Sequence, residues 1–102
     1  MEELNIVENS IETNTERKKL LFILNPRAGT MQASKNLSDI LQIFSDAGCL
    51  TSVLVTTKSG DAREFAHRYA NDYDVVACAG GDGTYNEMID GVISSGAKCK
   101  VG

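Results

Sequence analysis

A glycine-rich segment, residues 79–87 with the sequence AGGDGTYNE, concentrates residue types whose spacing allows chemistry. Gly80, Gly81 and Gly83 let the backbone turn sharply and remove side chains that would keep a ligand's phosphates away from main-chain N–H groups. Asp82 is the charged side chain of this loop. Because a carboxylate repels a bare phosphate, we expect a magnesium ion or its water shell to bridge Asp82 and phosphate oxygens.

The same segment also has a purely structural interpretation. Thr84 can cap a following helix, and Glu87, three residues later, completes the spacing of a capping box. The glycine spacing matches neither the dinucleotide fingerprint G-x-G-x-x-G nor the P-loop G-x-x-x-x-G-K-[ST]. The choice between a tight turn and a phosphate loop therefore depends on the neighbouring loops.

Apolar runs and helical periodicities alternate along the chain and predict the elements that position this segment. The continuous run Leu20–Leu24 is typical of a strand covered on both faces of a parallel sheet. Three further strands are predicted at 50–57, 74–79 and, beginning near the end of the sequence, 98–102, and helices at 31–47, 62–71 and 85–95. This alternation predicts a Rossmann-like open α/β fold, with a parallel sheet of three or four strands and right-handed crossovers.

Glycines and helix-capping residues predict where the helices begin and end. Gly48 and Gly96 stand where helix C-terminal glycines belong, and Ser59 or Asp61 is a suitable N-cap for the second helix. That helix should bury one stripe of side chains, namely Phe65, Ala66, Tyr69 and Ala70. His67 falls off the stripe, so we assign it no functional role.

Three loops leave the carboxyl ends of the predicted strands, at Asn25–Gly29, Thr56–Asp61 and Gly80–Thr84. Ligands of open parallel sheets bind beyond these strand ends. All three loops are rich in Gly, Ser, Thr, Asn or Asp, and Arg27 and Lys58 add positive charge. The loops together favour a nucleotide phosphate site over three unrelated polar turns.

Charge and composition bound the remaining function classes. With 42% apolar residues, the 102-residue chain suits one small globular domain or part of one. The formal net charge is −4, but residues 1–16 hold five Glu and no Lys or Arg, leaving ten basic and nine acidic residues in 17–102. This balance does not resemble the basic stripe of a nucleic-acid binder. We expect residues 1–18 to form a flexible acidic tail, with an added edge strand at residues 4–7 as the alternative.

The sequence contains no apolar run long enough to span a bilayer and no secretory signal pattern, so we expect a cytoplasmic protein. Its three cysteines, Cys49, Cys78 and Cys99, are widely spaced and contain no Cys-x-x-Cys pair. Neither a disulfide framework nor a zinc site is indicated.

At these loops the sequence resembles the nucleotide-binding half of the diacylglycerol kinase catalytic family, which includes bacterial lipid kinases and sphingosine kinases. Three landmarks carry the resemblance, which covers roughly residues 19–102: the loop Asn25-Pro26-Arg27-Ala28-Gly29, the combination of Thr56 with Gly60-Asp61-Ala62, and the signature Gly80–Glu87. Their order and spacing also agree with the family pattern.

The resemblance implies binding of ATP with Mg²⁺, and transfer of its γ-phosphate to a lipid hydroxyl such as that of diacylglycerol. It implies Asp82 as the residue near the metal, while no residue of this chain is assigned a catalytic role. The nucleotide-binding residues implied are Asn25, Pro26, Gly29, Thr56, Gly80, Gly81, Asp82, Gly83, Thr84, Tyr85, Asn86 and Glu87.

The sequence departs from the family pattern after Val101-Gly102, where a complete member continues into another Gly-Thr loop and a mostly β domain. We therefore expect residues 19–102 to be an α/β domain truncated at the fourth strand and inactive alone. The lipid acceptor would be bound mainly by the absent C-terminal domain, and a full-length lipid kinase would contact a membrane peripherally.

Two alternatives stay open on the sequence. A NAD kinase-like fragment shares the glycine signature, although it would not pair that signature with Asn-Pro-Arg-Ala-Gly and Gly-Asp-Ala. A non-catalytic module could instead form homo-oligomers through an exposed sheet edge.

Overall fold

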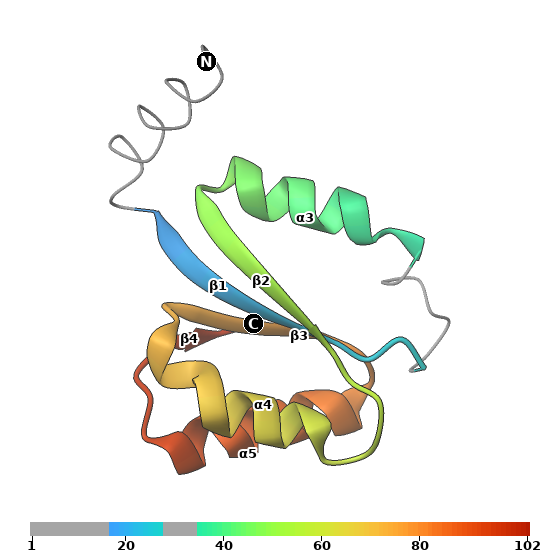
Figure 1. Cartoon of the computed structure of the whole chain (residues 1–102), viewed down its shortest axis with the longest axis vertical. Helices are drawn as coiled ribbons and strands as arrows, with labels where there is room; N and C mark the ends of the chain where they lie inside the picture. The colour runs from blue at the N-terminus through green and yellow to red at the C-terminus, as the bar shows by residue number, and fades with distance from the viewer. Residues whose placement is uncertain (1–16, 28–34) are drawn as a thin grey trace, which may run out of the picture.

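The computed structural model describes residues 17–27 and 35–102, which form an open α/β fold (Figure 1). Its strands are β1 (Lys18–Leu24), β2 (Cys49–Val55), β3 (Val75–Ala79) and β4 (Lys100–Val101). Its helices are α3 (Leu37–Asp46), α4 (Asp61–Tyr69), the short 3-10 helix η1 (Ala70–Asp72) and α5 (Asp82–Ser95). Most of the predicted acidic tail, residues 1–16, lies outside the described residues. The predicted site residue Gly29 also lies outside them.

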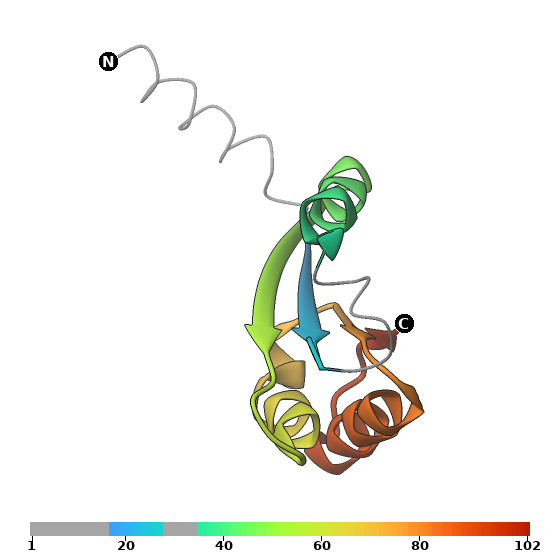
Figure 2. The ribbon, with the colours of Figure 1, turned by 90° about the vertical axis from the view of Figure 1, so that its right-hand side faces the viewer.

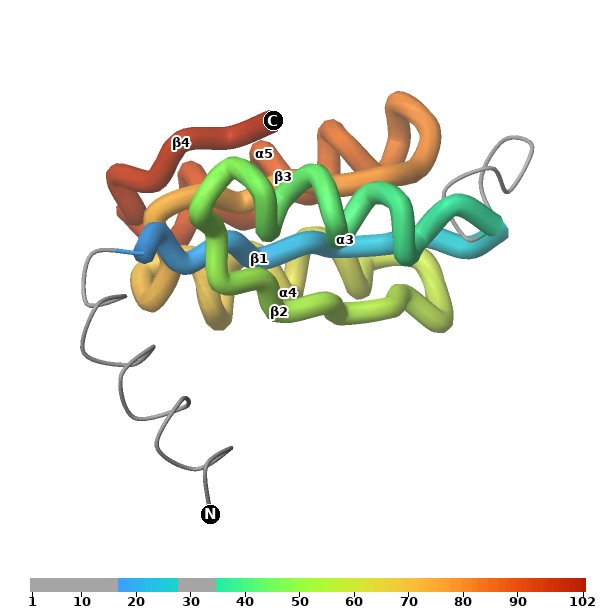
Figure 3. Tube along the Cα trace, turned by 90° about the horizontal axis from the view of Figure 1, so that it is seen from above, coloured from blue at the N-terminus to red at the C-terminus, as the bar shows by residue number. Residues whose placement is uncertain are grey.

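The four strands form one sheet in the order β2-β1-β3-β4, and every neighbouring pair is parallel. Figure 3 shows the strands side by side in this order. The parallel sheet predicted from the alternation of elements is confirmed. β1 lies inside the sheet, hydrogen-bonded to β2 on one side and β3 on the other. This position explains why its apolar run is continuous, since both of its faces are covered.

The helices lie on opposite faces of the sheet, with α3 on one side and α4 and α5 on the other (Figure 2). Under α4 and α5, the buried residues Leu21, Ile23 and Val76 form a core with Ala62, Ala66 and Met88. Under α3, the core contains Leu20, Phe22 and Leu24, and the Phe22 and Phe44 rings meet edge to face at 5.3 Å. The alternation of β1 side chains between two cores fixes its register.

Helices α4 and α5 lie unusually close at Gly91. A Cβ atom there would stand 2.3 Å from the Arg63 carbonyl oxygen, so only glycine allows this approach. Polar contacts continue along the line of contact between α4 and α5, which we call the seam. They join Arg63 to Asp90 and His67 to Ser94. The helix pair is therefore held by close backbone packing together with surface hydrogen bonds.

The observed ends of the elements refine the predicted ones. Gly48 and Gly96 have positive φ angles of 85° and 74°, which confirms them at helix C-termini. The predicted side-chain N-caps are wrong: α4 begins at Asp61 with Gly60 as its N-cap, and α5 begins at Asp82 with Gly81 as its N-cap. Neither helix has a side-chain cap hydrogen bond.

The strand order places a topological switch point between β1 and β3. The chain leaves β1 toward β2 on one side, and leaves β3 toward β4 on the other. Loops that follow such strands diverge and leave a crevice at the carboxyl edge of the sheet, where ligands bind in open α/β folds. In the part of the chain that the structure describes, no helix is long and apolar enough to cross a membrane.

Candidate functional site

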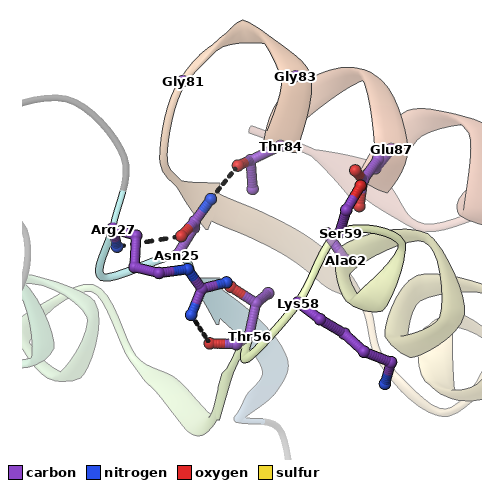
Figure 4. Close-up of a pocket in the computed structure, with 10 residues that line it drawn as sticks. All are labelled: Asn25, Arg27, Thr56, Lys58, Ser59, Ala62, Gly81, Gly83, Thr84 and Glu87. Carbon is purple, nitrogen blue, oxygen red and sulfur yellow. Dashed lines mark hydrogen bonds between the residues drawn. The ribbon is translucent and has the colours of Figure 1, made fainter.

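A pocket with a volume of about 370 Å³ lies at the carboxyl ends of β1, β2 and β3 (Figure 4). It brings together the three loops that the sequence predicted to meet. The lining residues are Asn25, Arg27, Thr56, Lys58, Ser59, Ala62, Gly81, Gly83, Thr84 and Glu87. Ala62 supplies the one apolar side chain among them, so the pocket suits a polar ligand.

Asn25, the first residue after β1, joins its loop to the glycine-rich segment. Its main-chain N–H donates to the Ala79 carbonyl at 2.9 Å, and its side-chain Nδ2 donates to Thr84 Oγ1 at 2.9 Å. Its Oδ1 atom accepts from the Arg27 N–H at 3.1 Å. Both polar atoms of this side chain therefore help to order the pocket wall, as Figure 4 shows.

Thr56, the first residue after β2, is 4% exposed and lines the pocket. Its main chain is well bonded, since its N–H donates to the Leu24 carbonyl at 2.8 Å and its carbonyl accepts from Arg27 Nη1 at 3.3 Å. Its hydroxyl Oγ1 is buried and has no hydrogen-bond partner among the described residues. A buried hydroxyl without a partner costs about 1–3 kcal/mol of stability.

Asp61 orders the turn between β2 and α4. Its Oδ2 atom accepts from Thr57 N at 2.8 Å, Thr57 Oγ1 at 3.0 Å and Lys58 N at 3.1 Å, and its Oδ1 accepts from Lys58 Nζ at 3.0 Å. The Thr57 main-chain N–H, together with the Lys58 ammonium, holds the pKa of this carboxyl well below its usual range. The Asp61 hydrogen bond also raises the pKa of Lys58. The carboxylate thus faces backward into the turn, which explains why it does not cap α4.

Thr84 and Glu87 do not form the predicted capping box. Thr84 lies in the first turn of α5, is 6% exposed and accepts from Asn25. Glu87 accepts through Oε1 from the Gly60 N–H at 3.1 Å. Both side chains bond to other loops because α5 begins earlier than predicted, at Asp82.

The glycines of the segment have different structural requirements. A Cβ at Gly80 would lie 2.6 Å from Thr84 Oγ1, so this glycine is needed for packing. At Gly81 and Gly83 a Cβ would meet nothing within 4 Å, and neither residue has a positive φ angle. Both line the pocket, so the space they leave open is available to a ligand.

Half of the predicted binding residues line the pocket, namely Asn25, Thr56, Gly81, Gly83, Thr84 and Glu87. Gly80, Asp82, Tyr85 and Asn86 are exposed on the neighbouring loop and first turns of α5, and Pro26 is half-buried beside Asn25. The predicted metal residue Asp82 is the first residue of α5. Within the described residues there is no group of three or more His, Cys, Asp or Glu side chains that could hold a metal.

The structure adds four lining residues that are not among the predicted ligands. In the sequence, Arg27 and Lys58 stand out only for their charge, Ser59 only as a helix cap and Ala62 only through the Gly-Asp-Ala landmark. The position of all four shortly after β1 or β2 was the available signal, because residues after a parallel strand lie at the ligand-binding edge.

The family model of the diacylglycerol kinase catalytic domain matches residues 19–102. The chain belongs to this family. Among curated diacylglycerol kinases, it is 40% identical over 87 residues to that of Staphylococcus aureus (strain bovine RF122 / ET3-1), covering 84% of this chain and 28% of the relative. It is 41% identical over 76 residues to that of Bacillus subtilis (strain 168), covering 74% of this chain and 25% of the relative.

Solved structures of the diacylglycerol kinase family share the fold. A crystal structure of a diacylglycerol kinase from Bacillus anthracis str. Sterne superposes with a TM-score of 0.73 at 30% identity, covering 85% of this chain and 32% of that one. The predicted α/β fold and the predicted family are both confirmed. The chain spans less than a third of the length of these diacylglycerol kinase relatives.

Proposed function

We propose that this chain is the ATP-binding part of a lipid kinase that transfers the γ-phosphate of ATP to a lipid hydroxyl such as that of diacylglycerol. The observation that carries the proposal is the polar pocket at the switch point of the sheet. It is lined by Thr56, whose buried hydroxyl has no partner among the described residues, and it has open space beside Gly81 and Gly83. Membership of the diacylglycerol kinase catalytic domain family supports phosphoryl transfer over other uses of such a pocket.

The chain's own residues supply positioning and positive charge, which are the main requirements of phosphoryl transfer. Arg27 and Lys58 line the pocket, and the first main-chain N–H groups of α5 begin beside Gly81. These N–H groups have no partner within the helix and carry the positive end of its dipole. The Lys58 ammonium is bonded to Asp61, so the Arg27 guanidinium and these N–H groups would hold and orient the phosphates.

We propose that magnesium arrives with the nucleotide. Mg²⁺ commonly binds through one or two carboxylates, with waters and substrate phosphates as its other ligands. Asp82 fits this arrangement as a single exposed carboxylate at the start of α5, next to the lining residues Gly81 and Gly83. A magnesium ion at this site would neutralise phosphate charge.

The acceptor lipid is proposed to bind to parts of the enzyme beyond this sequence. Ala62 is the one apolar side chain among the residues that line the described pocket, so the pocket does not suit acyl chains. The relatives named diacylglycerol kinase are also more than three times as long as the matched segment. Peripheral membrane contact of the full-length protein is part of the same proposal, and cosedimentation of a longer chain with lipid vesicles would test it.

Isothermal titration of ATP with Mg²⁺ into residues 1–102 tests the nucleotide site. We expect binding that weakens when EDTA replaces Mg²⁺ and when Asp82 is changed by Asp82→Asn. Gly83→Ala should weaken binding at least about tenfold, because its Cβ would occupy ligand space while meeting no protein atom within 4 Å. Asp90→Asn on the same helix is the charge-matched control and should bind ATP normally.

The titration also separates the alternatives. NAD in place of ATP tests the NAD kinase interpretation, and preferential binding of NAD would contradict the lipid kinase proposal. Failure of a folded chain to bind millimolar ATP would contradict the presence of a formed nucleotide site.

Self-association through a sheet edge is a separate proposal. β2 lies at the edge of the sheet that the described residues form, and its residues Leu50 and Val55 are 60% and 47% exposed. Exposed apolar edge strands promote pairing with another chain. Sedimentation velocity over a range of concentrations would detect a dimer, and a constant monomer mass would exclude it.

A further inference from the structure

We infer that Glu87 is a positioning residue, which fixes the β2–α4 turn (residues 56–60) against the first turns of α5 and so sets the shape of the pocket. The expected effect of Glu87 on ATP binding rests on the proposed nucleotide function. The positioning of the turn itself is argued only from contacts within the chain.

The contact that carries the inference joins Glu87 to Gly60. The Gly60 N–H donates to Glu87 Oε1 at 3.1 Å, across 27 residues of sequence. Gly60 closes the turn with a φ angle of 93°, and its carbonyl accepts from Glu64 N at 3.0 Å as α4 begins. Glu87 therefore holds the point at which the turn becomes helix α4.

The other carboxylate on this turn acts locally. Asp61 binds the main chain of Thr57 and Lys58, but it belongs to α4 itself. It can shape the turn without fixing where the turn lies relative to α5. In the described residues, the hydrogen bond between Gly60 and Glu87 is the one that joins the turn to α5.

Thr84 performs the corresponding task for the loop after β1. Residues three apart in a helix lie on the same face, so Thr84 and Glu87 face the pocket together. Thr84 holds Asn25 and Glu87 holds Gly60. One face of α5 thereby ties both other loops of the pocket to the glycine-rich segment.

The helix pair has other contacts that do not depend on Glu87. Arg63 with Asp90 and His67 with Ser94 repeat the same 27-residue offset along the seam. The close packing at Gly91 also lies beyond the pocket. Loss of the Glu87 side chain should therefore release the turn while α4 and α5 stay together.

The experiment compares Glu87→Ala, Glu87→Gln and Asp90→Ala in residues 1–102. Hydrogen exchange of the Gly60 amide, measured by NMR without nucleotide, reports the contact directly. We expect Glu87→Ala to speed this exchange at least about threefold, because the Gly60 amide loses its acceptor. Glu87→Gln keeps an Oε1 acceptor and should leave the exchange nearly unchanged. Asp90→Ala removes a seam contact outside the pocket and should also leave it unchanged.

Titration of ATP with Mg²⁺ supplies the second measurement. Glu87→Ala should raise the Kd roughly threefold to tenfold, and Glu87→Gln should restore it to within about twofold. If Glu87→Gln binds ATP as poorly as Glu87→Ala while Gly60 stays protected, the charge of Glu87 acts on the ligand and the inference is wrong.

Two further outcomes distinguish this inference from the proposed function. Unchanged Gly60 exchange in Glu87→Ala, or an equal effect from Asp90→Ala, would overturn the positioning role whatever ATP does. A wild-type chain that binds no ATP, but whose Gly60 exchange responds to Glu87→Ala as expected, would overturn the nucleotide function and leave the positioning of the turn supported.

Discussion

The side-chain amide of Asn25 donates a 2.9 Å hydrogen bond to the hydroxyl of Thr84, 59 residues further along the chain. Asn25 follows β1 and Thr84 lies in the first turn of α5, so the bond spans the switch point between β1 and β3. It holds two walls of the pocket at a fixed separation.

A double-mutant cycle with Asn25→Ala and Thr84→Val should show a coupling free energy of about 1 kcal/mol, because each change removes one partner of a part-buried hydrogen bond. The free energy of unfolding from urea denaturation measures it. Thr84→Ser is the matched control, since it keeps the hydroxyl. Additive effects of the two changes would show that this bond contributes little to stability.

Gly80→Ala should destabilise the fold by about 1–3 kcal/mol, because the new Cβ would stand 2.6 Å from Thr84 Oγ1 and displace a buried side chain. Gly81→Ala, one residue later, meets nothing within 4 Å and should change the free energy of unfolding by less than about 0.5 kcal/mol. Urea denaturation of both variants tests the contrast. Equal effects would mean that the clash at Gly80 is relieved by loop movement.

Gly91→Ala should separate α4 from α5, because its Cβ would lie 2.3 Å from the backbone oxygen of Arg63, which cannot move as a side chain can. We expect a loss of about 1–3 kcal/mol in the free energy of unfolding. Ile93→Ala, at a site 72% exposed on the same helix, is the control and should have a small effect. A stabilised Gly91→Ala variant would contradict the close approach of the helices.

Asp61 should contribute to stability in a pH-dependent way. Its pKa is lowered in the folded state by the hydrogen bonds from Thr57 and Lys58. Below the usual carboxyl pKa of about 3.9, the unfolded chain takes up a proton while the folded carboxylate stays ionised, so the free energy of unfolding decreases. The stabilisation is therefore present above this pH and is lost progressively below it.

Asp61→Asn removes that dependence. Urea denaturation at pH 7, 5 and 3 should show the variant less stable than wild type at pH 7 and 5, with the difference smaller at pH 3. A difference that stays constant over this range would show that Asp61 stabilises the turn without its charge.

The sequence alone predicted much of this fold for local reasons. The continuous run at Leu20–Leu24 indicated a strand buried on both faces, and the glycines at 48 and 96 marked helix ends that have positive φ angles. Alternating strands and helices required parallel pairing, which brings the loops after the strands to one edge. The location of the pocket at that edge follows from the hydrophobic periodicity of the sequence and the order of its strands and helices, without knowledge of any tertiary contact.

Only the tertiary structure decided which side chains meet in those loops. Thr84 and Glu87 have the local spacing of a capping box, yet they bond to Asn25 and Gly60, 59 and 27 residues away. Ser59 was predicted only as a cap but lines the pocket. The physical reason is that these partners depend on the strand order β2-β1-β3-β4 and on the residue at which α5 begins. The few residues that flank each side chain in the sequence determine neither of them.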